Sequence, residues 1–238
     1  MAEIIQYFSG EIALCGELYV SSPDERRPLV VVAHGDAGLT DFERERAQAL
    51  AGAGYTAFAI DLYGSAVTPR SPRRMLEEAS LLLANRMVLR DRMLAALHTA
   101  RAVPCVDPTR VAVVGYGLGG VGGLELARKG EPIVAAACFH SLLSAPHGPS
   151  PARVEAKVLA LLGSDDPFVG LRELELFEEE MRRLGVDYFV VRFGGASAAF
   201  AEAGHCTDAA SGFVHEPRAA RRAWRILLGF LEETLGVP

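Results

Sequence analysis

Short apolar runs alternate with longer amphipathic segments along most of the chain. Residues 3–9 and 11–20 have the pattern of two strands, and the Ser9-Gly10 dipeptide between them predicts an antiparallel hairpin. Residues 29–33 form a continuous apolar run rich in valine, which is typical of a strand buried on both faces of a parallel sheet. The pattern therefore predicts a hairpin followed by a buried strand.

The alternation continues to the C-terminus. We predict further strands at 55–60, 110–114, 133–139, 158–162 and 186–192, and helices at 41–53, 75–102, 118–129, 170–184 and 217–235. Strands that alternate with helices indicate an α/β fold with a mostly parallel central sheet and helices on both faces. In such a fold ligands bind beyond the carboxyl ends of the strands. The length suits a single domain, which we expect to span residues 1–238.

Composition excludes several classes of protein. Half of the residues are hydrophobic, which is too many for a disordered chain, and no apolar run approaches the roughly 20 residues of a membrane span. The net charge of −6 argues against a nucleic-acid partner, although Arg70, Arg73 and Arg74 form a small positive cluster that could attract an anionic ligand or simply be solvated. The N-terminal segment lacks the pattern of an export signal, so we expect a cytoplasmic protein with no membrane partner.

Cysteine usage points away from metal or disulfide chemistry. The four cysteines, Cys15, Cys105, Cys138 and Cys206, are far apart and form no CxxC motif. We therefore expect four buried thiols, and neither a metal site nor a cofactor.

A glycine-rich turn, VAVVGYGLGG, is the most distinctive motif. Gly115, Gly117 and Gly120 have the spacing of a dinucleotide-binding fingerprint, in which a carboxylate about 20 residues later binds the ribose. Residues 138–140 offer no such carboxylate, and the turn lies in the middle of the chain. The same turn fits the nucleophile elbow of hydrolases, which lifts a Ser or Cys above the sheet, except that Gly117 stands where the nucleophile belongs.

Around this turn the chain resembles the dienelactone hydrolase family of α/β hydrolases, whose elbow usually looks like GYCFGG. The resemblance covers nearly the whole chain and is carried by VVVAHGDAGLTDFERERAQALAGAGYTAFAIDLYG, VAVVGYGLGGVGGLELA, ACFHS, VLALLGSDDPFV and VVRFGGA. It implies the α/β-hydrolase fold and ester or lactone hydrolysis by a catalytic triad.

The resemblance also exposes departures at the positions that carry the family's chemistry. The family has a glutamate after the histidine of its first long strand, and here His34 is followed by Gly35. The nucleophile position is Gly117. The acid is retained as Asp166, whereas the base position, in the GGASAAF segment at 194–200, is Ala198.

A second alignment remains open for the base. Glu202-Ala203-Gly204-His205 resembles the EAGH segment that precedes the histidine in other family members, and it would make His205 the base. The first alignment continues without a gap into the last helix, so we prefer Ala198. With either alignment, no Ser or Cys stands at the elbow to be deprotonated.

Several polar groups near the strand ends could still act on a ligand. By the resemblance, the backbone N–H groups of Leu118 and Asp36 correspond to the oxyanion-binding donors, which need no particular side chain. His34 and His140 could face the pocket as acid-base groups or serve as structural histidines. Tyr116 could line the site or pack beside it.

Three further side chains have two interpretations each. Asp36 could supply a carboxylate near the lost glutamate or lie exposed in a loop. Asp166 could keep a polar role or cap the following helix. Ser141 is a conceivable substitute nucleophile, but the sequence identifies no base for it.

These observations leave three functional hypotheses. The first is non-covalent catalysis on a small ligand, such as a cyclisation, elimination, isomerisation or hydration. The second is a small-molecule-binding pseudoenzyme without activity. The third is residual ester or lactone hydrolysis through Asp166 and His205. All three hypotheses involve a small-molecule ligand. The sequence does not determine the oligomeric state.

Overall fold

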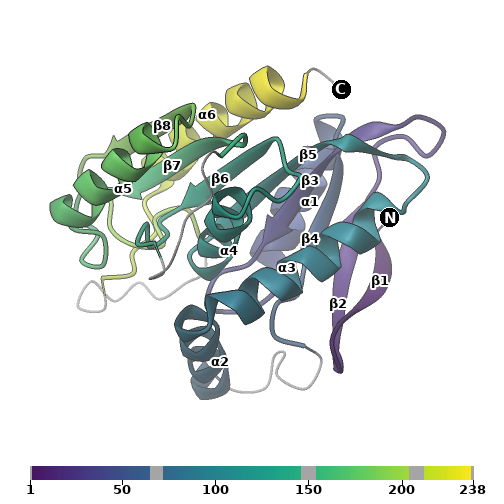
Figure 1. Ribbon diagram of the computed structural model, residues 1–238, viewed down its shortest axis with the longest axis horizontal. Coiled ribbons are helices and arrows are strands. Elements are labelled where there is room, and N and C mark those ends of the chain that lie inside the picture. The colour runs from purple at the N-terminus through teal and green to yellow at the C-terminus, as the bar shows by residue number, and fades with distance from the viewer. Residues whose placement is uncertain (1, 65–71, 146–153, 204–211, 237–238) are drawn as a thin grey trace.

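Eight strands form one central sheet in the order β1-β2-β4-β3-β5-β6-β7-β8 (Figure 1). The computed structural model describes residues 2–64, 72–145, 154–203 and 212–236. The strands are β1 (Ala2–Ser9), β2 (Ile12–Tyr19), β3 (Arg27–Ala33), β4 (Thr56–Ile60), β5 (Val106–Tyr116), β6 (Ala135–Phe139), β7 (Lys157–Gly163) and β8 (Tyr188–Phe193). The helices are α1 (Asp41–Gly52), α2 (Pro72–Ala84), α3 (Arg86–Arg101), α4 (Leu118–Arg128), α5 (Leu171–Arg183) and α6 (Pro217–Leu235).

The sheet is antiparallel at its N-terminal edge and parallel elsewhere. Strands β1 and β2 pair as a hairpin, and β2 runs antiparallel to β4. Every other neighbouring pair, from β4-β3 to β7-β8, is parallel. The predicted α/β-hydrolase fold, with its N-terminal hairpin and mostly parallel sheet, is confirmed.

Helices cover both faces of the sheet and enclose two apolar cores. One core contains side chains of α2, α3, α4 and α5 together with alternate residues of the strands, such as Val31 and Val113. The other contains side chains of α1 and α6 with the intervening residues, such as Val30 and Val114. Successive side chains of a strand point to opposite faces, so a strand buried on both faces needs the continuous apolar runs seen in the sequence.

The helix predicted for residues 75–102 is wrong in one respect, because the chain forms two helices there. Asn85 separates α2 from α3 with its backbone at φ −120°, and its side chain accepts a hydrogen bond from the Val88 N–H. Asparagine is a favoured N-cap residue because its side chain satisfies an N–H group that the helix leaves unpaired. The hydrophobic period continues across Asn85, which is why the pattern alone did not reveal the break.

Strand β5 is longer than predicted and begins at Val106. Its first residues pair with Arg27 and Pro28 of β3 before a shift in register between Pro28 and Leu29. None of the helices among the described residues is long and apolar enough to cross a membrane. The carboxyl ends of β3, β5, β6 and β7 lie together, where the sequence analysis places the site.

Candidate functional site

The turn between β5 and α4 has the geometry of a nucleophile elbow without a nucleophile. Gly117 adopts φ +46° and ψ −113°, a strained conformation that a residue with a side chain rarely tolerates. The other glycines of the turn allow close packing: a Cβ on Gly115 would lie 2.2 Å from the carbonyl carbon of Gly119. A Cβ on Gly117, in contrast, would meet nothing nearer than the Gly35 Cα at 3.7 Å and Asp36 Oδ1 at 3.9 Å. The elbow therefore has room for a side chain at Gly117.

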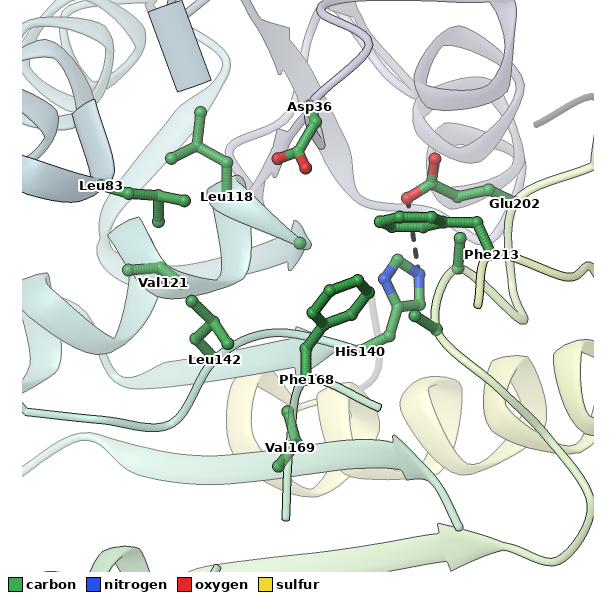
Figure 2. A pocket seen from close by; sticks show the side chains of 13 residues that line it. Asp36, Leu83, Leu118, Val121, His140, Leu142, Phe168, Val169, Glu202 and Phe213 are labelled. Atoms are coloured by element: carbon green, nitrogen blue, oxygen red, sulfur yellow. Dashed lines mark ion pairs between the residues drawn. The ribbon is translucent and has the colours of Figure 1, made fainter. Parts of the chain in front are cut away.

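A pocket of about 240 Å³ opens beside Gly117. Its other lining residues are apolar or ionisable: Leu83, Leu118, Val121, Leu142, Phe168, Val169, Ala198, Ala199 and Phe213 are apolar, and Asp36, His140 and Glu202 are ionisable. Figure 2 shows His140 and Glu202 together on one side, with the leucines and Val121 on the other. The pocket can thus hold an apolar ligand against a small acid-base group.

His140 lies at the end of β6 in a strained backbone conformation. Its φ is +39°, and Ala199 at +54° is the other non-glycine residue with positive φ in the part of the chain that is described. Both line the same pocket. Such a conformation costs about 1–3 kcal/mol and persists where the surrounding structure holds it for a function. The imidazole also packs edge-on against Phe200, with ring centroids 5.5 Å apart.

The carboxyl group of Glu202 is the partner of this histidine. Glu202 Oε1 lies 3.5 Å from His140 Nε2, and Glu202 is only 4% exposed. Burial raises the pKa of Glu202 well above its usual value, and the nearby carboxylates of Glu43 and Asp36 raise it further. The raised pKa favours the protonated form of the Glu202 carboxyl group, which avoids an unpaired charge in a buried position.

Glu202 is a site residue that the sequence did not predict. Its segment resembles the family only as the residues that precede His205. In the fold, Glu202 Oε1 would lie 3.1 Å from a Cβ on Gly35, the position where the resemblance expects a glutamate. A carboxyl group thus reaches the same space from another part of the chain. Two features of the sequence could have identified Glu202. The family's glutamate is missing after His34, and a glutamate occurs instead near the segment that holds the base position.

Asp36 and Leu118 lie on the pocket, as two of the predicted site residues. Asp36 points its side chain toward the elbow, and its backbone carbonyl accepts a hydrogen bond from the Tyr63 hydroxyl at 3.0 Å. Leu118 is the first residue of α4, whose N-cap Gly117 has no side chain to cap the helix. The N-terminal N–H groups of a helix attract negative charge, so this end of α4 can bind a carbonyl oxygen or an oxyanion.

His34 and Tyr116 are buried beside the pocket rather than lining it. His34 Nε2 accepts the Leu62 N–H at 2.9 Å, and its Nδ1 lies 2.7 Å from the Gly35 carbonyl, to which it donates. Both ring nitrogens are therefore used within the fold. Tyr116 packs its ring against Phe42 and Phe139, with centroids 4.8 Å away in each case.

The remaining predicted residues are placed as follows. Asp166 lies outside the pocket lining and accepts the Phe168 N–H at 2.8 Å, in a turn that precedes α5; burial raises its pKa. Ala198 lines the pocket. Ser141 is fully buried and donates to the Phe139 carbonyl at 2.8 Å. His205 lies outside the described residues.

Other predicted features fall partly outside the described chain. Arg70 and Cys206 belong to undescribed segments. Cys105 and Cys138 are buried as expected, but the expectation is wrong for Cys15, which is only partly buried in the hairpin strand β2. Arg73 pairs with Glu77 on the exposed face of α2, with 2.9 Å between the charged groups. Across the described residues, no group of three His, Cys, Asp or Glu side chains is arranged to hold a metal ion.

The open space at Gly117 leads to a first prediction. Replacing Gly117 by cysteine should give a folded protein whose introduced thiol reacts with iodoacetamide, at a cost of about 1 kcal/mol for a side chain at positive φ. Peptide mass spectrometry separates this site from the native thiols, of which Cys105 and Cys138 are buried. The unmodified protein is the control. If the introduced thiol were labelled only after denaturation, the prediction that the elbow is accessible would be wrong.

The raised pKa of Glu202 leads to a second prediction. Because the folded-state pKa exceeds the unfolded one, wild-type stability falls as pH rises from about 4.5 through the folded-state pKa. Glutamine stays neutral over that range, so Glu202→Gln should become more stable relative to the wild type at pH 8 than at pH 5. Urea unfolding at both values measures the change, with exposed Glu45→Gln as control. A difference that does not grow with pH would contradict the assignment.

Comparisons with known proteins agree with this fold. The family model described as "Dienelactone hydrolase family" matches residues 17–235. A solved dienelactone hydrolase-like promiscuous phosphotriesterase from metagenomic libraries has a TM-score of 0.93 and 31% identity, and the match covers 99% of both chains. A Bradyrhizobium protein named probable 2-oxo-3-(5-oxofuran-2-ylidene)propanoate lactonase is 29% identical over 216 residues, which cover 87% of this chain and 84% of that protein.

A third relative shows that the similarity extends to animals. An uncharacterised protein of Caenorhabditis elegans is 31% identical over 147 residues, or 61% of this chain and 93% of that protein. The family model, however, matches nearly the whole chain, from the end of β2 through the elbow to the end of α6. The chain therefore belongs to the dienelactone hydrolase family.

Proposed function

We propose that this protein catalyses proton transfer on a small, mostly apolar unsaturated carbonyl compound, such as an isomerisation, without a covalent intermediate. The observation that carries the proposal is the His140–Glu202 pair, 3.5 Å apart, in the pocket beside Gly117. Covalent hydrolysis needs a nucleophile at the elbow, and Gly117 supplies none. Gly35 and Ala198 likewise lack the groups that the family pattern places at their positions.

The pair can carry one mobile proton between two states. In the first, a protonated Glu202 carboxyl group faces Nε2 of a neutral His140 across 3.5 Å, and the proton on Nδ1 is available to a ligand. In the second, Nδ1 has given up its proton, the Glu202 proton has moved to Nε2, and Glu202 is ionised. Nδ1 is then a base that can remove a proton from a carbon next to a carbonyl group. Figure 2 supports this role, because the ring edge that carries Nδ1 is turned away from Glu202.

The rest of the pocket suits a carbonyl substrate. Removal of a proton beside a carbonyl places negative charge on its oxygen, and the N-terminus of α4 at Leu118 can stabilise that charge. The aliphatic and aromatic lining offers few hydrogen-bonding groups to water, and a bound apolar ligand would displace water from it, which strengthens such interactions. Asp36 disfavours a substrate with its own carboxylate near the elbow. A small neutral lactone or enone meets these conditions.

Proton NMR in D₂O tests the proposal with 5-methyl-3H-furan-2-one, an unsaturated lactone that can isomerise by moving one proton. A furanone is chosen because the Bradyrhizobium relative carries an oxofuran lactone in its printed name. We expect the conjugated isomer to form with deuterium on the carbon that receives the proton, faster than in buffer alone. Ring opening as the only reaction would contradict the proposal and favour hydrolysis through Asp166 and His205.

A non-catalytic binding protein is the second candidate, and the mainly apolar lining of the pocket favours it. Its signature would be saturable binding of the furanone, seen as line broadening, with no isotope exchange and no ring opening. A small-molecule ligand and a cytoplasmic location are parts of both proposals.

A further inference from the structure

A second pocket lies between α1 and α6. It has a volume of about 350 Å³ and is lined by residues that include Arg46, Tyr116, Phe139, Arg221, Trp224 and Arg225. Its inner wall is formed by direct chain neighbours of the catalytic pocket: Tyr116 precedes Gly117, and Phe139 precedes His140. The two pockets therefore have walls made of adjacent residues of the chain, but their linings differ in chemistry.

The second pocket is rich in positive charge. Three arginines, Arg46, Arg221 and Arg225, line it together with His215. Among the described residues, none of these three guanidinium groups lies within 4.0 Å of a carboxylate. Glu216 is the nearby acid, but its two carboxylate oxygens bind the Arg218 and Ala219 N–H groups at the start of α6. Within the described part of the chain, no carboxylate neutralises these three positive charges.

Arg46 is held in place by aromatic rings rather than by an acid. Its guanidinium carbon lies 5.1 Å from the ring centroid of Phe42 and 5.0 Å from that of Trp224. Its Nε is buried and has no hydrogen-bond acceptor among the described residues. A buried donor without an acceptor is costly, and Arg is the side chain best suited to binding a carboxylate with two parallel hydrogen bonds. Arg46 is therefore preorganised to receive an anion.

We propose that the pocket between α1 and α6 binds a small aromatic carboxylate. The carboxylate group pairs with Arg46 and Arg221 at the cationic rim, and the ring packs against the aromatic wall of Tyr116, Phe139 and Trp224. Aromatic rings in such a site prefer edge-on or offset packing. The proposal is independent of the reaction in the first pocket.

Trp224 makes the proposal directly testable, because it is the only tryptophan of the chain. Benzoate, the probe, should change the intrinsic tryptophan fluorescence with saturation at one site, and isothermal calorimetry should give the same affinity. Neutral benzamide, which has the same shape, should bind at least tenfold more weakly. Inorganic phosphate should also bind at least tenfold more weakly, because it lacks the ring.

Two variants and a control locate the binding. Arg46→Gln and the more exposed Arg221→Gln should each weaken benzoate binding about tenfold or more. Arg222→Gln, on the same helix but outside the pocket lining, should leave it within about twofold. Circular dichroism verifies that each variant is folded, and Arg221→Gln decides the matter if Arg46→Gln does not fold.

Four results would overturn the proposal: no fluorescence change and no heat of binding, equal binding of benzamide, equal binding of phosphate, or unchanged benzoate affinity in Arg221→Gln.

Discussion

Replacing His140 by glutamine is expected to slow deuterium incorporation into the furanone by about 10²–10⁴-fold, the range that one positioned acid-base group supplies. Glutamine has a similar reach and keeps a polar contact to Glu202, but it cannot accept or release a proton at neutral pH. The loss should appear in kcat, with KM changed little, because the apolar lining that binds the ligand is untouched. Proton NMR in D₂O measures the rate.

The control for this variant is His98→Gln, since His98 is an exposed histidine of α3 far from the pocket lining. It should exchange at the wild-type rate. Thermal unfolding separates a chemical role from a structural one, because His140→Gln must remain folded at the assay temperature. If the folded variant retained activity within about threefold of wild type, His140 would not be the proton-transferring group.

Replacing Gly119 by alanine is expected to destabilise the protein by about 3 kcal/mol or more, at the upper end of the usual cost of overpacking. The new Cβ would lie 2.4 Å from the carbonyl oxygen of Ala33 and 2.6 Å from its carbonyl carbon. These are backbone atoms of β3, a central strand, so neither α4 nor the strand can move aside without breaking neighbouring hydrogen bonds. Gly119 also donates its N–H to the His34 carbonyl at 2.9 Å. Urea unfolding measures the loss.

The matched control is Gly229→Ala in α6, where a Cβ would meet no atom within 4 Å. There the same substitution removes backbone freedom from the unfolded chain, and we expect it to stabilise the protein by up to about 1 kcal/mol. Opposite signs at the two positions would show that close packing at the elbow, and not helix propensity, requires glycine. Equal effects would contradict this explanation.

The order of strands and helices could be predicted because it rests on local patterns. The buried valines of β3, the Ser9-Gly10 turn and the elbow glycines each carry their signal within a few residues. The division between α2 and α3 escaped prediction because a cap at Asn85 decides it, while the apolar period runs through. The predicted elements are therefore correct where burial determines the structure. The prediction is wrong at Asn85, where a single side-chain hydrogen bond determines it.

The candidate site was less predictable than the fold. The resemblance located Gly117, Leu118 and Asp36, which do line the pocket. The resemblance pointed to Asp166 as the retained acid. Among the described residues, however, the carboxyl group that lies beside a histidine in the pocket is that of Glu202. That contact joins two loops 62 positions apart in the chain, and no periodicity or spacing rule reports such a contact.

The claim that this pocket works without a covalent intermediate is tested most directly by intact-protein mass spectrometry after reaction with a fluorophosphonate and, separately, with p-nitrophenyl acetate. We predict that the mass of the protein stays unchanged at a saturating concentration of either reagent. We also predict that p-nitrophenol is released without an initial burst. One adduct per chain, mapped to a residue that lines the pocket beside Gly117, would contradict the account.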